Sequence, residues 1–545
     1  MSFLNKIFQS IPVKIPDRSG FDLSHEVLTS AACGTVIPIT HFEVLPGDTI
    51  SMGSMMRVTL PPFAVPFMGR IDAELTAAFI PNRLLWAGWH SFITQNDGTN
   101  ISGHSGPNAR SIPYNVPVME DDFPNSRQTL ADYLGCPDTA NSPSPNALPF
   151  LAYHKFCDDW IRDDNLMKPF FSKVPYTQGA LPSYNAYLVH YLNSFFNLNN
   201  PNSWTGLSYG SFASLYPEEI NPSFLAECPF DVTIGLGDLR QRCWAKDYFT
   251  TATTRPQAGA ASSVVFDTSG NTGSITIASL RAANSLQKWM ERNNIAGTDY
   301  GDQILSHFGV RPPDSVLNRS VLLGSVRTPV YVGSVENNSG ANSQGAGGTA
   351  SSSPYGSILG SAAGFGSATD KGSLVDNFTA KEHGYIMVFF TLIPHAYYDS
   401  GIIRSMLHST IGDYAWPEFA GIGDQPIYSG ELSSSDDNQQ IFGYNQRYSE
   451  YKFLPDRVSG YLATGQPLSA FALKRNFGGA IAELGSDFLE IPKDYLSQVF
   501  AYWENGDTPT TSGVSTGDGG FSCIINAYFD CKALRVLPEY SLPHL

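Results

Sequence analysis

The chain has 545 residues, of which 42% are hydrophobic and 12% aromatic, so it can bury a large core and is not disordered as a whole. Its 49 glycines, 37 prolines and 15% charged residues favour a mainly β fold with many turns and little solvated helix. The net charge of -17 excludes a surface that neutralises a nucleic acid unaided, because the chain as a whole repels phosphate.

An extended N-terminal arm is predicted over residues 1–42, where prolines punctuate a segment too small to bury its own core. Asn5, Lys6, Gln9 and Pro12 interrupt the apolar residues at its start, so the pattern is not that of a signal peptide. No stretch reaches the roughly eighteen consecutive apolar residues of a membrane helix. We therefore expect a protein made in a cytoplasm, without a membrane partner.

Strand patterns begin after this arm. Pro46, Gly47 and Asp48 predict a turn in which Gly47 supplies a positive φ, and apolar residues alternate with others over 50–60. A second strand is predicted over 71–81, followed by a short helix that carries two tryptophans. Strands and helices do not alternate in regular βαβ units, so a Rossmann-type sheet is not expected.

Long insertions are predicted over residues 93–324. The Asn, Asp, Gly, Ser and Pro content of 96–149 indicates surface loops around a short helix at 129–134. Apolar residues recur at helical spacing near 150–166 and again near 279–294, which predicts two helices that interrupt strand-like sequence.

Residues 333–373 are rich in Gly, Ser, Ala and Asn and have little to bury, so we expect a Gly/Ser-rich surface loop. Candidate residues for contact with a host surface in this loop are Asn337, Asn338, Ser352 and Tyr355. Aromatic and β-branched runs after the loop predict further strands, which lead to an extended C-terminal tail over 530–545.

Patterns for hydrolysis are weak. Residues 206–210 have the GxSxG spacing of a hydrolase elbow, but neither a buried strand before them nor a helix after them is predicted. The acidic pairs Asp158/Asp159 and Asp163/Asp164 could serve glycoside hydrolysis or a metal, yet a solvated helix face is the better interpretation.

Patterns for metal binding are weak as well. The eleven histidines, among them His154 and His395, are scattered singly and form no HExxH pair. The seven cysteines are widely spaced and include no CxxC pair, which predicts reduced, mostly buried thiols. No catalytic residue, metal ligand or cofactor is therefore expected.

Several stretches distributed along the chain agree, in order, with one family. They are FDLSHEVLTSAACGTVIPITHFEVLPGDT (21–49), FIPNRLLWAGWHSF (79–92), YHKFCDDWIRDDNL (153–166), KDYFT (246–250), LRAANSLQKWMERNNIAGTDYGDQILSHFGVRPPDSVLNRSVLLG (280–324), EHGYIMVFF (382–390), YAWPEFAGIGDQPI (414–427) and FGYNQRYSEYKF (442–453). With these residues the chain resembles the major capsid proteins of the Microviridae, especially the gokushovirus-type branch. The resemblance runs nearly from end to end, which is far more specific than any one motif.

The resemblance implies an eight-stranded antiparallel jelly-roll β-sandwich with long loop and α-helical insertions, formed as a single domain over 1–545. It implies a coat protein without enzymatic activity, which self-assembles through pentamers into a small icosahedral T=1 shell around the circular single-stranded DNA genome of a bacteriophage. Residues 251–279 are shorter than a variable insertion common in the family, so surface protrusions would be small, absent, or built from 197–235 or 333–373.

The resemblance also implies partners. These are further copies of the chain, the single-stranded DNA genome, a small basic DNA-binding virion protein, a pilot or minor virion protein, and a host surface receptor. The small basic protein would supply the positive charge that a chain of net charge -17 lacks. The protein would reside in the virion and be assembled in the cytoplasm of the bacterial host.

Two groups of candidate site residues lie near the ends of the strand-rich sequence. Positive charge close to aromatic residues favours DNA contact at Lys6, Lys14, Arg18, Lys532 and Arg535. Extended and aromatic segments suit contacts between neighbouring copies. The candidates for inter-subunit contact or a structural turn are Phe21, Asp22, His25, Pro46, Gly47 and Asp48.

Two other functions compete with this interpretation. A secreted carbohydrate-binding or glycoside-cleaving β-sandwich would explain the many tryptophans and tyrosines, but the odd cysteine count and the missing signal peptide weigh against it. A host-attachment protein of a larger phage would be a minor component of its particle, whereas a coat protein would dominate it.

Overall fold

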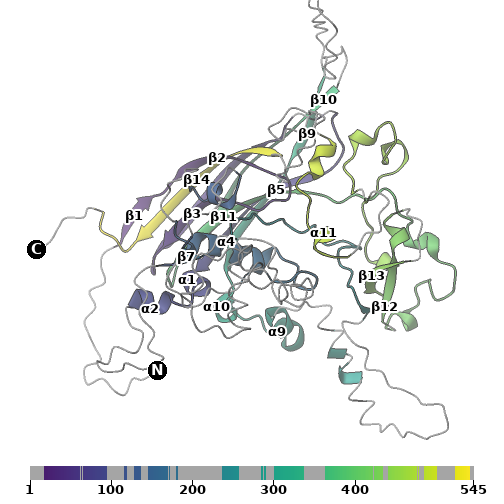
Figure 1. Cartoon of the computed structure of the whole chain (residues 1–545), viewed down its shortest axis with the longest axis horizontal. Helices are drawn as coiled ribbons and strands as arrows, with labels where there is room; N and C mark the ends of the chain where they lie inside the picture. The colour runs from purple at the N-terminus through teal and green to yellow at the C-terminus, as the bar shows by residue number, and fades with distance from the viewer. Residues whose placement is uncertain are drawn as a thin grey trace, which may run out of the picture.

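Two antiparallel β-sheets form the centre of the protein in the computed structural model (Figure 1). The residues that the structure describes are 18–94 apart from 62 and 64, 116–119, 128–136, 145–169, 171, 180–181, 236–256, scattered positions of 281–292, 300–336, 362–433 apart from 422, 440–499 apart from 476 and 478–483, and 522–539.

The first sheet has six strands in the order β1, β14, β4, β10, β9, with β2 also paired to β14. Its strands are β1 (Ser19–Asp22), β2 (His25–Ala31), β4 (Thr49–Thr59), β9 (Tyr331–Glu336), β10 (Ala362–Thr379) and β14 (Cys523–Arg535). β1 and β2 follow one another along the same edge of β14, and β4 pairs with its other edge. The strand nearest the C-terminus therefore lies inside the sheet.

The second sheet has four strands in the order β3, β11, β5, β8. Its strands are β3 (Ile37–Val44), β5 (Ile71–Pro81), β8 (Val321–Pro329) and β11 (Gly384–Pro394). β5 and β11 pair along their whole length, and each of these inner strands is buried at nearly every position. Such continuous burial indicates that both faces of this sheet are covered.

The two sheets pack against each other through every second residue of their strands. Every second residue of β14 from Cys523 to Ala533 is buried, while the residues between them are exposed or half-buried. On β11, Val388 and Phe390 belong to the core between the sheets, whereas Met387 and Phe389 belong to a second core on the opposite face. The sandwich and an outer layer thus share the four-stranded sheet.

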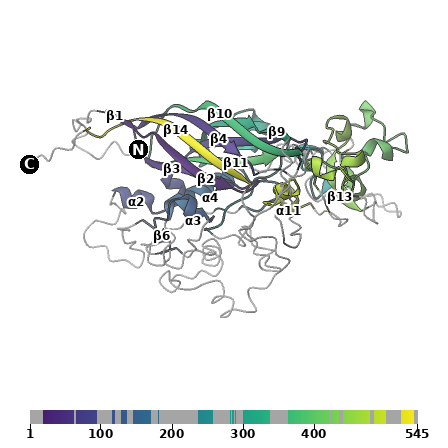
Figure 2. The same ribbon diagram turned by 90° about the horizontal axis from the view of Figure 1, so that it is seen from above.

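The outer layer consists of helices that lie on the side of the four-stranded sheet (Figure 2). They are α1 (Asn82–Leu85), α2 (Trp89–Thr94), α3 (Leu130–Tyr133) and α4 (Leu148–Trp160). The ring of Phe156 on α4 stacks on Phe389, with 3.8 Å between the centroids and 5° between the planes. These helices belong to a first insertion, which lies between β5 and β8. It also contains β6 (Val118–Met119), β7 (Ala180–Leu181), α9 (Tyr300–Phe308) and α10 (Asp314–Leu317).

The segment between β11 and β14 forms a second insertion, drawn in green beside the sheets in Figure 1. It contains the hairpin strands β12 (Asp424–Tyr428) and β13 (Ile441–Gln446), the helix α11 (Ser486–Leu489), and the 3-10 helices η3 (Arg404–Leu407), η4 (Pro417–Phe419), η5 (Ser429–Glu431), η6 (Ser449–Tyr451), η7 (Gly460–Leu462), η8 (Ser469–Phe471) and η9 (Tyr495–Gln498). A small core of its own includes Tyr398, Ile427 and Phe488, together with Tyr248 and Phe249 from the first insertion.

The two ends of the described chain are more ordered than their composition predicts. The arm predicted over 1–42 is replaced from Ser19 onward by β1, β2 and the first part of β3, and the tail predicted over 530–545 begins inside β14. Each of these strands finds its hydrogen-bonding partners at a distant place in the sequence, which local composition does not reveal. Residues 1–17 and 540–545 lie outside the described residues.

The Gly/Ser-rich stretch 333–373 also differs from the loop that it predicts. Its first residues belong to β9, and its last residues, from Ala362, belong to β10. Glycine has a packing role there: a Cβ at Gly364 would lie 3.0 Å from Cβ of Phe63, a fully buried residue. The candidate host-contact residues Asn337, Asn338, Ser352 and Tyr355 lie outside the described residues.

The predicted helices form where periodicity places them. The helix predicted near 150–166 is α4, which ends at Trp160, and the short helix predicted at 129–134 is α3. The described positions of 281–292, within the helix predicted near 279–294, are helical.

Candidate functional site

The two ends of the described chain meet at one corner of the six-stranded sheet. β1 pairs with β14 in a register that places Ser19 opposite Arg535 and Asp22 opposite Lys532. The turn that precedes β4 lies beside them, because Asp48 forms an ion pair with Arg535. Residues 18–25, 45–49 and 530–536 are called the terminal corner below. It unites the described DNA-facing and turn residues that the sequence predicts.

The predicted turn is present and its glycine has the predicted conformation. The amide of Leu45 donates to Oδ2 of Asp48 at 3.0 Å, and the amide of Asp48 donates to the carbonyl of Leu45 at 3.0 Å. Gly47, which follows Pro46, has a φ of 92°, in the left-handed region that favours glycine. Its amide donates to the carbonyl of Ala380 at 2.8 Å, which fixes the turn next to the end of β10.

Arg535 binds this turn through its guanidinium group. Its Nε lies 3.2 Å from Oδ2 of Asp48, which has no exposed surface, and its Nη2 donates to the carbonyl of Glu43 at 2.9 Å. A buried carboxylate needs such a cation, because an unpaired buried charge costs several kcal/mol. Only 18% of the Arg535 side chain is exposed, so little of it is available to a phosphate.

Lys532 is exposed but also paired. Its Nζ lies 2.7 Å from Oδ2 of Asp22 and 3.3 Å from Oδ1 of Asp530. The hydrogen bonds from Lys532 and Ser24 hold the pKa of Asp22 well below its usual range, and the bond to Asp22 raises the pKa of Lys532. One lysine between two carboxylates leaves a local negative charge, which does not favour a nucleic-acid backbone.

His25 joins the two sheets within one subunit. Its Nδ1 lies 2.8 Å from the carbonyl of Leu23 and its Nε2 lies 2.7 Å from Oγ1 of Thr40 on β3. Its ring centroid lies 5.4 Å from that of Phe529 on β14. Phe21 is half-buried opposite Ala533. Contact of these residues with another subunit stays a prediction.

The five candidate DNA-facing residues thus have different environments. Arg18 is exposed, and its Nη2 would lie 3.4 Å from a Cβ at Gly47 in the turn. Lys532 and Arg535 have carboxylate partners, and Lys6 and Lys14 lie outside the described residues. The terminal corner is therefore better suited to hold the ends of the sheet together than to bind DNA through Lys532 and Arg535.

The acidic residues of α4 and the following turn do not form the solvated face that the sequence predicts. Asp159 accepts hydrogen bonds from the amide and the hydroxyl of Ser320 at 2.8 and 2.7 Å and pairs with Lys155 at 2.7 Å. Asp163 pairs with Lys246, and its side chain is 5% exposed. That prediction was wrong, because later segments of the chain cover these carboxylates and use them to anchor α4.

The described residues contain no group of three or more His, Cys, Asp or Glu side chains that could hold a metal ion. His154 Nε2 lies 3.0 Å from the carbonyl of Leu236, and His395 Nε2 lies 3.3 Å from Oδ2 of Asp72, so both act within the fold. The six described cysteines are free thiols, four of them buried, as predicted. The GxSxG sequence at 206–210 lies outside the described residues.

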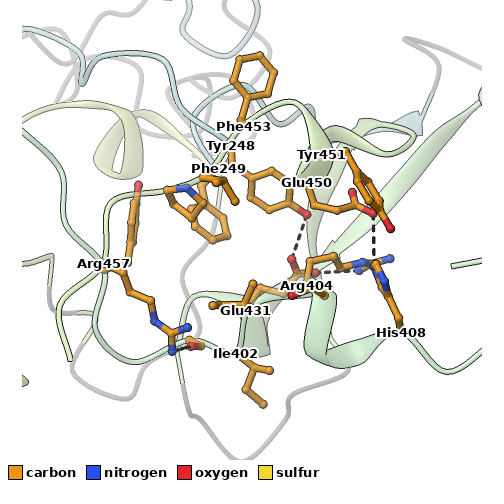
Figure 3. Close-up of a pocket in the computed structure, with 16 residues that line it drawn as sticks. Tyr248, Phe249, Ile402, Arg404, His408, Glu431, Glu450, Tyr451, Phe453 and Arg457 are labelled. Carbon is orange, nitrogen blue, oxygen red and sulfur yellow. Dashed lines mark hydrogen bonds and ion pairs between the residues drawn. The ribbon is translucent and has the colours of Figure 1, made fainter. Parts of the chain in front are cut away.

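A pocket of about 260 Å³ lies between the two insertions (Figure 3). Its wall is mostly apolar and carries the rings of five tyrosine and phenylalanine residues, Tyr248, Phe249, Tyr398, Tyr451 and Phe453. This pocket is not predictable from the sequence, because its residues come from segments of the chain that only folding brings together. The aromatic content of 444–453 was the available signal, and it was interpreted as a strand pattern.

The polar groups of the pocket are paired with one another. Arg404 Nη1 donates to Oε1 of Glu431 at 2.8 Å, and the hydroxyl of Tyr248 donates to Oε2 at 3.0 Å, as Figure 3 shows. Burial raises the pKa of Glu431, and burial together with this carboxylate raises the pKa of Tyr248. Arg457 Nη2 donates to the carbonyl of Gly401 at 3.0 Å. The pocket therefore has an apolar wall, and its charged side chains are already paired with other groups of the protein.

No helix in the described part of the chain combines the length and the apolar character needed to cross a membrane.

Comparison with known proteins covers almost the whole chain. A family model described as "Capsid protein (F protein)" matches residues 9–545. The capsid protein VP1 of Chlamydia phage 1 is 27% identical over 623 aligned residues, which cover 100% of this chain and 98% of that protein. The capsid protein VP1 of Bdellovibrio phage phiMH2K is 27% identical, with 83% and 84% covered, and that of Spiroplasma virus 4 is 25% identical, with 97% and 95% covered.

These matches extend over the segments that form the terminal corner and the pocket. They also agree in extent with the stretches quoted from the sequence, which run from residue 21 to residue 453. The chain belongs to the phage capsid protein (F protein) family, as its resemblance to the major capsid proteins of the Microviridae predicted.

Proposed function

We propose that the chain is the subunit of a T=1 icosahedral shell that encloses the circular single-stranded DNA genome of a bacteriophage. The observation that carries this proposal is the match to the capsid family over 9–545. Full-length relatives named as capsid proteins of three phages support it. We assign the protein no enzymatic activity and no cofactor.

The proposed subunit fold is an eight-stranded jelly roll. The strand orders β2, β14, β4, β10 and β3, β11, β5, β8 support it, since both sheets are antiparallel and pack face to face. Taken in chain order, these eight strands change sheets at every step except the one from β5 to β8. This alternation is typical of the two Greek keys of a jelly roll.

We treat residues 1–545 as one domain built on this jelly roll. The insertions over 93–324 and between β11 and β14 then decorate its ends. The sequence between β9 and β10, which includes Asn337, Asn338, Ser352 and Tyr355, is the candidate for host contact. The residues before Ser19 and after Arg535 are the candidates for contact with neighbouring copies in this proposal.

The genome requires positive charge from outside this chain. The net charge of -17 and the carboxylate partners of Lys532 and Arg535 support a separate small basic DNA-binding protein in the virion. Lys6, Lys14 and Arg18 stay as candidates for direct DNA contact. A pilot or minor virion protein, a host receptor, pentameric intermediates and assembly in the host cytoplasm complete the proposal.

Sedimentation velocity at two wavelengths tests it, because protein and nucleic acid are then measured in the same boundary. Particles purified from infected cells should sediment as one uniform species with nuclease-resistant DNA, in which this chain is the dominant protein. Electron cryo-microscopy of that species should show one copy per icosahedral asymmetric unit. Particles in which this chain is a minor component would overturn the proposal and favour an attachment protein.

A further inference from the structure

The surface around the pocket is unusually apolar. Residues 402–419 and 451–454, called the aromatic surface below, expose large side chains that include Ile402 (43%), Met406 (78%), Trp416 (46%), Tyr451 (57%), Phe453 (50%) and Leu454 (86%). The two stretches meet at His408, whose ring lies 5.3 Å from that of Tyr414 and 6.2 Å from that of Tyr451. Isolated exposed apolar residues are ordinary, but a cluster of this kind is not.

The area of the aromatic surface is that of a protein interface. At roughly 100 Å² per half-exposed large side chain, the cluster offers on the order of 1,000 Å². The largest apolar patch of a typical monomer is about 300–600 Å², whereas each partner in a standard interface contributes about 800 Å². The pocket would supply the concave centre in which an anchoring side chain of a partner is buried.

The chemistry of the pocket favours an apolar protein side chain over a small polar ligand. Glu431 is already neutralised by Arg404 and hydrogen-bonded by Tyr248, and Arg457 is bound to the carbonyl of Gly401. A sugar would need polar groups of the protein to replace its hydrogen bonds to water. Such groups are largely engaged among the described lining residues, so the apolar wall is the main feature that a partner can use.

The chain contains a second apolar element that lacks cover in the described structure. α9 has no buried residue. The described residues of 281–316, called the α9 segment below, expose Leu286 (47%), Trp289 (51%), Tyr300 (69%), Leu305 (45%), Phe308 (78%) and Val316 (69%). The ring of Trp289 stacks on that of His307 at 6.0 Å, which joins α9 to the helical residues before it. An amphipathic helix is normally stabilised by burying this face.

We propose that the aromatic surface of one copy binds the α9 segment of a second copy of this chain. This inference rests on the proposed function, in which every copy is surrounded by others. The contact joins two different surfaces, so it is head-to-tail and closes into a ring when it repeats around a rotation axis. An apolar helix in an aromatic groove is a common recognition mode, and its anchors recur at helical spacing as Leu305 and Phe308 do.

Chemical cross-linking tests the contact directly. Leu454→Cys and Phe308→Cys are made in separate full-length chains at two exposed positions, co-assembled, and treated with a short bis-maleimide. A covalent dimer is expected from shells that contain both variants, whereas shells with either variant alone should give only the background of the native cysteines. Equal amounts of dimer in the mixed and single-variant shells would overturn the proposal.

Charge insertion provides a second test by sedimentation velocity. Leu454→Asp and Phe308→Asp should each remove the shell boundary and leave a folded subunit by circular dichroism. The matched control is Leu28→Asp, since Leu28 on β2 is 72% exposed and belongs to neither surface. Formation of shells by both test variants would overturn the inference. An equal loss of shells in the Leu28→Asp control would overturn it as well. Absence of shells from the unmodified chain under conditions that support infection would instead overturn the proposed function.

Cysteine labelling distinguishes contact with a second copy from binding of a receptor or a sugar at the pocket. In intact shells, Leu454→Cys should be protected from a soluble maleimide and become reactive when the shells are dissociated. Full reactivity in intact shells would mean that the aromatic surface faces the medium, as a receptor-binding or sugar-binding groove does, and would overturn contact with a second copy.

Discussion

Nε of Arg535 lies 3.2 Å from Oδ2 of Asp48, so a cation at the end of β14 neutralises a carboxylate that has no exposed surface. Arg535→Gln should therefore lower the free energy of unfolding by about 2–4 kcal/mol, because Asp48 would remain buried without its cation. Urea unfolding followed by tryptophan fluorescence measures the loss. Lys532→Gln is the control, since its partners Asp22 and Asp530 are exposed, and it should leave the stability unchanged. Equal losses in the two variants would contradict this account.

The turn before β4 should not tolerate a β-branched residue. Gly47 has a φ of 92°, so Gly47→Val should destabilise the subunit by about 1–3 kcal/mol and lower the yield of particles. Gly47→Asn should be milder, because asparagine enters the left-handed region more easily. Gly20→Val, in an open position on β1, serves as the control. Thermal unfolding and particle counts measure both effects, and normal values for Gly47→Val would refute the prediction.

A buried histidine should make the subunit less stable in mild acid. Burial lowers the pKa of His154 well below its usual value, and the Nε group of Arg240 donates to its Nδ1 at 3.3 Å, which favours the neutral ring. The unfolded chain takes up a proton on this residue below about pH 6.5, whereas the folded chain does not. The stability that the neutral ring contributes is complete above that pH and is lost as the pH falls towards the folded pKa.

The free energy of unfolding between pH 7 and pH 5 checks the sign. The loss attributable to His154 should approach about 1.4 kcal/mol per pH unit. His154→Gln should lower the number of protons taken up on unfolding by one, which reduces the dependence of stability on pH. A smaller pH dependence should persist, because burial also lowers the pKa of His41. An unchanged slope in this variant would show that His154 is not the group responsible.

The stack between Phe156 and Phe389 should hold the outer helical layer on the sandwich. Both rings are buried, so Phe156→Ala should cost about 3–5 kcal/mol and make α4 accessible to protease. Trp289→Ala, at a half-exposed ring of the α9 segment, should change subunit stability much less. Limited proteolysis with mass spectrometry would locate the cuts. Cuts confined to the second insertion would contradict this role for Phe156.

Sequence patterns predicted the inner strands of the sandwich because burial there follows short-range rules. Alternation in β4 and β14 and the continuous apolar run of β11 are visible in single segments, and each forms a strand. β1 and β10 were missed in whole or in part, because their pairing with distant strands outweighs a proline-rich or glycine-rich composition.

The same limit applies to the candidate sites. The turn at Gly47 was predictable, since a Pro-Gly-Asp sequence specifies its own conformation. The partners of Lys532 and Arg535 were not, because Asp22 and Asp48 lie at the other end of the sequence. The environment of the acidic residues near α4 was mispredicted for the same reason, because contacts with Lys246 and Ser320 decide it. The aromatic pocket was not predicted, because residues of both insertions form it.

The position of β14 has a consequence for the order of synthesis. Because β14 separates β1 and β2 from β4, the six-stranded sheet has a vacant centre until the last strand leaves the ribosome. A chain that terminates before Cys523 lacks the strand that joins both halves of this sheet, and it exposes two unpaired edges instead. The fold thus discriminates against incomplete translation products, which cannot present the same surfaces to a growing assembly as a full-length chain.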